Sequence, residues 1–533
     1  MNGLDVFVVV SYLVGLLLLG YALRQQQNEK DYYLAGRTIS WAPLTLSTMA
    51  TQLSAISFIS APAFVGLRED GGLKWLSYEL ALPLAMILLI FVVTPALYRA
   101  GAVSIYSYLE RRFDLRTRLL VSLSFQVVRS FSTGIMVYAM ALILDAVLGI
   151  SHWQAILWVG VITLLYASTG GMRAVVYGDA LQMILIFIGL LLVGAYALAS
   201  AGSLGTALEG VASERLIAIN FSALGLNGDG FGFWPMLIGG VVLYASYYGC
   251  DQSEAQRILS ARSLRDAQKL LLANGLLRFP LVLLYCLVGL LVGYVAQNDS
   301  SLFARIPTDK PDYLMPLFII EYLPHGAIGL LLVAILSAAM SSLSSAVNSL
   351  SAATLSDLES IGVKPNNPSA QLTWARATSL LWGVAILITS LFAGAIAPTV
   401  IEAINKVGSA LFGPILGVFL LAIGSKRTSS LAASAGLLTG ATVNLGLWKF
   451  QPQLFWMWWN VTGLLTCLAV AYAITLLAHT NVEAAGRQRP GEPHQPNQRA
   501  PTSYAVFLLI AFAIILLTSL SAESWALAGL ALH

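Results

Sequence analysis

Long apolar stretches dominate this sequence and leave few folds open to it. Fourteen segments of at least 18 residues are predominantly apolar, and about 20 such residues in a helix cross a bilayer core roughly 30 Å thick. Only 10% of the residues are charged, whereas a soluble domain carries about 25%. The sequence therefore predicts an all-α, polytopic membrane protein of about fourteen transmembrane helices, at residues 3–23, 41–66, 74–98, 118–149, 152–169, 177–201, 232–249, 269–296, 326–356, 371–395, 399–423, 428–448, 453–478 and 503–521.

The sequence indicates a single membrane domain over residues 1–533. The first apolar stretch follows no basic segment and ends at no small-residue cleavage site, so we expect a retained transmembrane helix. The three cysteines lie in or beside apolar stretches, which does not indicate a disulfide framework. A net charge of +3 is too small to indicate nucleic-acid binding. The expected partner is the lipid bilayer, and no obligate protein partner is indicated.

Basic residues alternate in density from one loop to the next. With the N-terminus placed outside, the inward loops hold twenty lysines and arginines and the outward loops hold six. Basic loops stay on the cytoplasmic side of a membrane. We therefore expect a multi-pass protein of a bacterial inner (plasma) membrane with both termini outside.

Two of the apolar stretches contain runs of hydroxyl side chains. Residues 47–57 include six hydroxyl or amide side chains, and Pro62 follows. Such residues weaken a helix, and an interrupted helix frees backbone carbonyls that can bind a hard cation. Residues 337–345 are rich in serine, and Ser341 and Ser345 share one helix face. The two runs favour a cation site, although small residues also simply allow close helix packing.

Several charged residues fall at membrane depth, where they are costly and usually face a cavity or a partner. The basic ones are Arg129, Arg278 and Lys406, and the acidic ones include Glu79 and Asp179. They indicate either a polar pathway or ion pairs between helices. Asp179, about one turn inside its stretch, can complete a cation site or can instead stabilise the start of its helix.

Motifs spread along the chain carry a family resemblance. They are the segment 31–37 (DYYLAGR) with Trp41, Gly170-Gly171 with Asp179 and Gln182, the segment 256–263 (QRILSARS), which is expected with Arg257 in a cytoplasmic loop, Ser341-Ser342 with Asn348-Ser349, Gly413-Pro414 and Lys426-Arg427. In this order, from about residue 31 to 430, they resemble the sodium:solute symporter family, which includes sodium–sugar, proline, pantothenate and sialic acid symporters.

The resemblance implies a leucine-transporter-type fold with two inverted five-helix repeats. The repeats are expected at 41–201 and 232–423, with peripheral helices at 3–23, 428–448, 453–478 and 503–521. The solute is expected near the midplane, between the interrupted first helices of the two repeats.

The resemblance also implies a set of ligands. The first sodium site would use the backbone of Ala50, Leu53 and Ala338 and the hydroxyls of Ser341 and Ser342. A second sodium site can be formed by Asp179 with Ser341, Ser344 and Ser345. The expected solute-binding residues are Gln52, Ser54, Ser57, Tyr78, Glu79, Tyr244, Tyr247, Arg278 and Lys406.

These solute positions match individual relatives unevenly. Ser77-Tyr78-Glu79 resembles a sugar-symporter motif whose glutamate bonds a sugar hydroxyl, but Tyr244 stands where those proteins have asparagine. The arginine that binds the carboxylate in sialic acid symporters aligns with Ser132, and Arg129 lies one turn earlier. A sugar or polyol is favoured, and a carboxylate, an amino acid or a vitamin stays open.

The function expected is sodium-coupled symport of a small polar solute by alternating access, with proton coupling through Asp179 as an open alternative. An intramembrane enzyme is less favoured, because the five histidines lie in loops, at span edges or at the terminus and no HExxH motif occurs. A sensor with a kinase domain is less favoured because only about twelve residues follow the last span.

Overall fold

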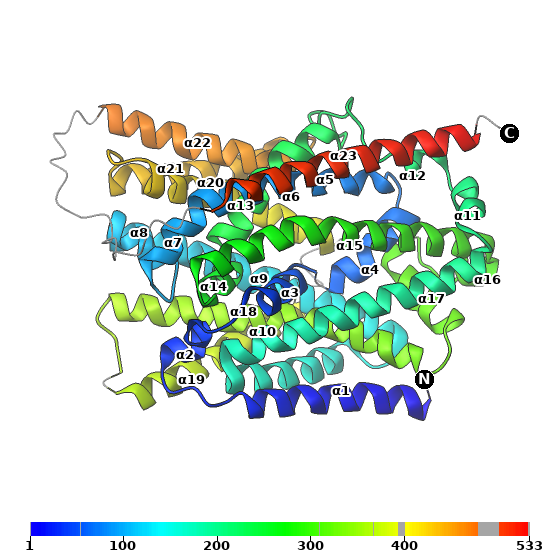
Figure 1. Ribbon diagram of the computed structural model, residues 1–533, viewed down its shortest axis with the longest axis horizontal. Helices are drawn as coiled ribbons and strands as arrows, with labels where there is room; N and C mark the ends of the chain where they lie inside the picture. The colour runs from blue at the N-terminus through cyan, green and yellow to red at the C-terminus, as the bar shows by residue number, and fades with distance from the viewer. Residues whose placement is uncertain are drawn as a thin grey trace.

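The computed structural model describes residues 2–53, 55–308, 310–365, 367–392, 400–477 and 500–530. Over these residues it is built from helices without a β-strand, so the predicted all-α class is confirmed. Figure 1 shows that the axes of the long helices are roughly aligned with one another. The longest are α1 (Gly3–Ala22), α9 (Leu115–Leu148), α10 (His152–Ala201), α15 (Leu264–Asn298), α18 (Ala327–Ser360), α19 (Pro368–Phe392), α20 (Val400–Gly424), α21 (Ser430–Phe450), α22 (Met457–Leu477) and α23 (Thr502–Leu530).

The described helices account for the fourteen predicted spans. Eleven are long and apolar enough to cross a membrane, and a twelfth span is the bent pair α3 (Trp41–Gln52) and α4 (Ala55–Gly66). A further, shorter apolar helix covers Pro235–Cys250 and ends in α13 (Gly240–Cys250). The remaining span comes from α10, which is too long to be one crossing.

Helix α10 folds back on itself at Gly171. This glycine has φ 56° and ψ −154°, a backbone conformation outside the helical region. In a straight helix, residues 166 and 178 would be about 18 Å apart. Instead, a Cβ built on Gly178 would lie 3.6 Å from the ring of Tyr166. The two halves are therefore antiparallel neighbours, as the separate stretches 152–169 and 177–201 predict.

Glycines bring α4 and α15 into direct backbone contact. A Cβ added to Gly293 of α15 would lie 2.6 Å from the Cα of Gly66, and one added to Gly289 would lie 2.7 Å from the carbonyl oxygen of Pro62. Small residues of this kind allow close packing where lipid supplies no hydrophobic drive for association. The half-helix α4 is thus fixed against α15.

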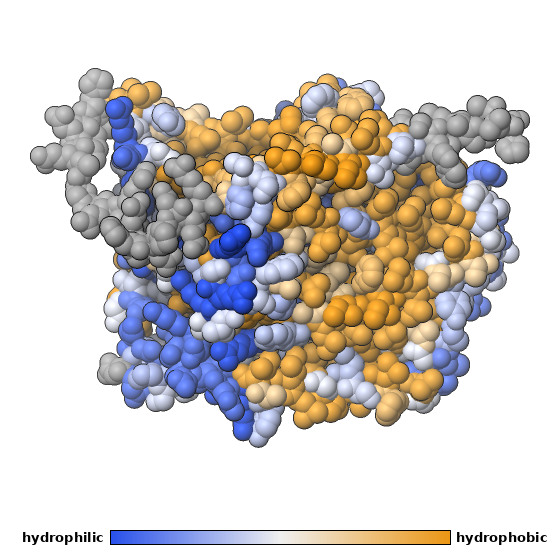
Figure 2. Space-filling model, viewed as in Figure 1, coloured by the Kyte–Doolittle hydropathy of each residue, from blue (hydrophilic) through white to orange (hydrophobic). Residues whose placement is uncertain are grey.

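The two ends of the molecule differ in polarity. The start of α1 and the end of α23 lie at the right-hand end in Figure 1, whereas α2 (Glu29–Leu34), α8 (Tyr106–Arg112) and α14 (Gln252–Ser260) lie toward the left. Hydrophilic residues gather most densely on the left of the same view, others line the right-hand edge, and an apolar surface covers the region between them (Figure 2). We call the left-hand end the basic end, because the loops that are richest in lysine and arginine lie there.

Candidate functional site

Two helices are interrupted at the centre of the molecule. The first, α3–α4, bends by 57° at a break after Leu53. The second breaks at Asp251, whose backbone is extended (φ −88°, ψ 124°) between α13 and α14. The Asp251 carboxylate accepts a hydrogen bond of 2.7 Å from the backbone N–H of Ser253 and so caps α14. The chain is thus interrupted within the stretch 41–66 and directly after the stretch 232–249, which are the first stretches of the two expected repeats.

A cavity of about 160 Å³ lies beside the two breaks. Helices α3, α4, α9, α13, α15 and α20 contribute to its wall. Five of the predicted solute residues line it, and they are Gln52, Ser57, Tyr78, Tyr247 and Arg278. The other lining residues were not predicted to bind solute, and the polar or aromatic ones among them are Trp75, Arg129, Ser132, Asp251, Tyr285, Phe412 and Trp456.

Arg129 supplies a cationic group to this cavity. Its residue is only 6% exposed, and its Nε is buried without a hydrogen-bond partner. Its ion pair with Asp251 is long, with 3.6 Å between Nη1 and Oδ2, and the other oxygen of Asp251 caps α14. The guanidinium also lies 6.0 Å from the centre of the Tyr247 ring. Arg129 therefore retains donor capacity toward the cavity.

Arg278, in contrast, is paired. Its Nε donates to Oε2 of Glu79 at 2.9 Å, and its Nη2 lies 3.4 Å from Oε1. The hydroxyl of Tyr244 donates to the same carboxylate at 3.1 Å, and the Tyr244 ring stacks on that of Tyr78 at 4.4 Å. Glu79 is thus bound on both oxygens, and it lies behind the cavity wall rather than in it.

The predicted residues of the first sodium site come from the end of α3 and the middle of α18. All five are buried: Ala50, Leu53, Ala338, Ser341 and Ser342. On α18, the last three lie on the same helix face as Ser345, and Ser345 contacts Thr51 of α3 at 3.2 Å between hydroxyl oxygens. The hydroxyl of Ser341 has no partner, and that of Ser342 bonds the Ala338 carbonyl at a long 3.3 Å.

Asp179 is the centre of a buried polar cluster next to that site. Its Oδ2 accepts from Arg257 Nη2 and from the Ser47 hydroxyl, each at 2.7 Å. Arg257 also donates to Ser345 and, at 2.7 Å, to Ser47. The other oxygen, Oδ1, has no hydrogen-bond partner. Ser344 bonds the backbone carbonyl of Ser341 at 3.1 Å. The acid lies among the expected serines, but a guanidinium pairs with it.

Arg257 was predicted to lie in a cytoplasmic loop, and this is wrong, because α14 is packed inside the protein and Arg257 is 1% exposed. Lys406, on α20, is outside the cavity lining. Ser54 lies outside the described residues.

Comparison with known proteins finds relatives by sequence and by fold. A family model described as the sodium:solute symporter family matches residues 32–440. The human sodium/iodide cotransporter is 31% identical over 83% of this chain and 68% of its own length. The sodium-coupled monocarboxylate transporter 1 of Xenopus laevis is 30% identical over 82% of this chain and 72% of its own length. A solved structure of a Na⁺-coupled sialic acid symporter superposes with a TM-score of 0.80 at 23% identity, over 89% of this chain and 98% of that one.

Proposed function

Because this chain belongs to the sodium:solute symporter family, we propose that it imports a small organic anion with one carboxylate together with sodium. The chain is a multi-pass membrane transporter and not an enzyme, and sodium is its coupling ion. Its fold is that of the sodium-coupled, leucine-transporter-type proteins.

The observation that carries the anion proposal is the guanidinium of Arg129. It lies in the cavity with an unpartnered Nε, and a guanidinium matches the planar fork of a carboxylate. The sugar or polyol expectation depended on Glu79 as an acceptor for solute hydroxyls. Glu79 already binds Arg278 and Tyr244, so it has less capacity for that role. A transporter of monocarboxylates among the relatives supports the same choice.

An uptake panel in proteoliposomes tests this proposal. Labelled lactate, pantothenate, iodide and glucose are offered with and without a sodium gradient. We expect sodium-dependent uptake of the carboxylates, in competition with one another. Sodium-driven uptake of glucose that the carboxylates do not inhibit would contradict the anion assignment and favour a sugar. Uptake of iodide alone would restrict the solute to an inorganic anion.

For the first sodium we propose the carbonyls of Ala50, Leu53 and Ala338 with the hydroxyls of Ser341 and Ser342. The interrupted end of α3 leaves backbone carbonyls without helical partners. The serine face of α18 lies next to this end of α3, because Ser345 contacts Thr51. For a second sodium we propose Asp179 with Ser341, Ser344 and Ser345. The unpartnered Oδ1 of Asp179 and the unpartnered hydroxyl of Ser341 support this set.

Removal of the Ser342 hydroxyl is expected to weaken sodium coupling. The lost oxygen lies in a dry site, where such a loss costs about 1–3 kcal/mol. In Ser342→Ala the sodium concentration for half-maximal uptake should therefore rise about tenfold. Ser356→Ala, four turns further along α18, serves as the matched control and should leave that concentration unchanged. An unaltered sodium dependence in Ser342→Ala would remove Ser342 from the ligand set.

We propose that the repeats span 41–201 and 232–423 and that the basic end faces the cytoplasm of a bacterial inner membrane. Cysteines introduced at Gln27 and Ser300, which are exposed on opposite sides of the predicted membrane, test the orientation. In intact cells an impermeant maleimide should label Ser300→Cys and spare Gln27→Cys. Labelling of both positions, or the reverse pattern, would contradict the orientation.

A further inference from the structure

Helix α14 is polar in sequence and entirely buried. None of its nine residues is more than 5% exposed, although six carry polar or charged side chains. It packs against α3, α13 and α18 at the basic end of the cavity. Since Asp251 lines the cavity and caps this helix, α14 separates the solute site from the basic end.

Hydrogen bonds satisfy most of the polar groups on α14. Gln256 donates to the Tyr33 carbonyl at 2.6 Å and to Asn348 at 2.7 Å. Ser253 bonds Ser349 at 2.7 Å. Hydrogen bonds exchange with those of water at little net cost, so an interface of this kind opens to water more readily than an apolar one.

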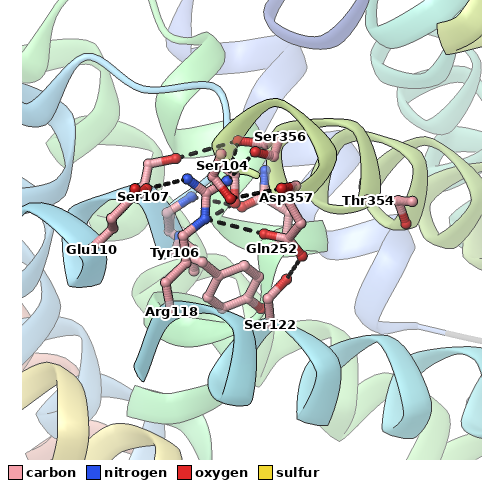
Figure 3. Close-up of polar contacts among 12 residues, drawn as sticks. Ser104, Tyr106, Ser107, Glu110, Arg118, Ser122, Gln252, Thr354, Ser356 and Asp357 are labelled. Atoms are coloured by element: carbon pink, nitrogen blue, oxygen red, sulfur yellow. Dashed lines mark hydrogen bonds and ion pairs between the residues drawn. The ribbon is translucent and has the colours of Figure 1, made fainter. Parts of the chain in front are cut away.

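The first residue of the helix is anchored beside a second polar cluster. Gln252 accepts a hydrogen bond from the Ile105 N–H at 2.9 Å and donates to the Val103 carbonyl at 2.8 Å. Figure 3 draws it in one group of polar side chains with Arg118, whose guanidinium binds Glu110 and Asp357 and so ties α8 and α9 to α18. The start of α14 is thus held by hydrogen bonds to the segment that precedes α8.

Glu254 is the exception on this helix. It is 1% exposed, and neither of its carboxylate oxygens has a hydrogen-bond partner. Two cations, Arg257 and Arg129, and one carboxylate, Asp251, face it, and the Tyr247 hydroxyl is a hydrogen-bonding group beside it. An ionised carboxylate has several acceptor sites, and a protonated one has a donor as well. Apart from the Tyr247 hydroxyl, the closed arrangement offers no hydrogen-bond donor to the carboxylate of Glu254, whereas water would supply several.

We propose that Glu254 is a positioning residue that destabilises the closed arrangement of α14 and thereby sets how readily the cavity opens toward the basic end. When α14 separates from α3 and α18, its partnered side chains exchange their bonds for water and Glu254 gains bonds that it lacked. The inference concerns the opening step, so it does not depend on which solute is carried.

Cys250 provides the reporter for this step. It is 2% exposed, ends α13 and lies in a small hollow beside Asp251, the residue that caps α14. In a Cys286→Ala/Cys467→Ala background it is the single cysteine of the chain. The rate at which an impermeant maleimide modifies Cys250 is measured in inverted vesicles and, for comparison, in right-side-out vesicles. Glu254→Leu, Glu254→Asp and the matched control Gln256→Leu are introduced into this background.

We expect Glu254→Leu to slow modification from the basic end by about five- to tenfold and to raise the melting temperature, whereas Glu254→Asp should keep the parent rate. Gln256→Leu removes the hydrogen bonds to the Tyr33 carbonyl and to Asn348 and should therefore speed modification. A rate in Glu254→Leu equal to or above that of the parent would overturn the proposal. So would a Glu254→Leu protein that fails to fold, because Glu254 would then hold the helix in place. Failure of the anion proposal in the uptake panel leaves these rates unaffected.

Discussion

Replacement of Arg129 by glutamine is expected to abolish sodium-dependent uptake of carboxylates at micromolar concentration. The guanidinium is the cavity's incompletely paired cation, and a hydrogen bond to a charged group contributes about 1.5–3 kcal/mol. Its loss should weaken solute binding about 10- to 100-fold. The measurement is the concentration dependence of uptake, and Arg129→Lys should be impaired as well, since an ammonium cannot make the bidentate contact.

Sodium binding separates a specific defect from a damaged fold. The proposed sodium ligands lie on α3 and α18 and do not include Arg129. Sodium should therefore still raise the melting temperature of Arg129→Gln, as a ligand of the folded state does. Normal carboxylate uptake by Arg129→Gln would exclude this arginine as the anchor and would leave the paired Arg278 as the next basic residue to test.

The second large effect is expected at the buried pair of Asp179 and Arg257. Both side chains are at most 1% exposed, and their charged atoms are 2.7 Å apart. Removal of one partner from a buried ion pair typically costs about 3–5 kcal/mol, because the other charge remains without compensation. Asp179→Asn and Arg257→Gln should therefore each lower the melting temperature strongly and reduce the amount of protein in the membrane.

The double variant Asp179→Asn/Arg257→Gln should recover much of the lost stability, since it leaves no unpaired charge. Its sodium dependence then tests the second sodium site. A Hill coefficient for sodium that is above one in the parent and close to one in the double variant supports Asp179 as a sodium ligand. A coefficient that stays above one would restrict Asp179 to a structural ion pair. No recovery of stability would show that the two residues do not act as a pair.

Local chemistry in the sequence was sufficient to predict the first helix break. The hydroxyl run at 47–57 and Pro62 both weaken a helix, and the structure breaks it after Leu53. Apolar length likewise predicted the separate stretches on either side of Gly171, where positive φ reverses the chain. Both signals act within a few residues, so a single sequence contains them.

Features that depend on distant partners were not predictable in the same way. The polar segment around Arg257 has the composition of a solvated loop, and its burial depends on Ser47, Asp179 and Ser345 from three other helices. Glu79 and Arg278 were each singled out as intramembrane charges, but nothing in one sequence says that they pair across 199 positions. Arg129 was also singled out as an intramembrane charge, and its position in the cavity wall is what suggests that it binds the solute.

We expect α4 and α15 to move together as one rigid body. At Gly66, Gly289 and Gly293 the two backbones touch, so there is no side chain between them whose rotamer could absorb a displacement. Close-packed contacts transmit strain, and Arg278 on α15 travels with the half-helix α4. The half-helix before the break, α3, is attached to Asp179 through Ser47 instead. Leu53 therefore lies at the hinge between two rigid units, α3 on one side and α4 with α15 on the other. The angle between these units determines how far the solute-binding residues move when either unit rotates.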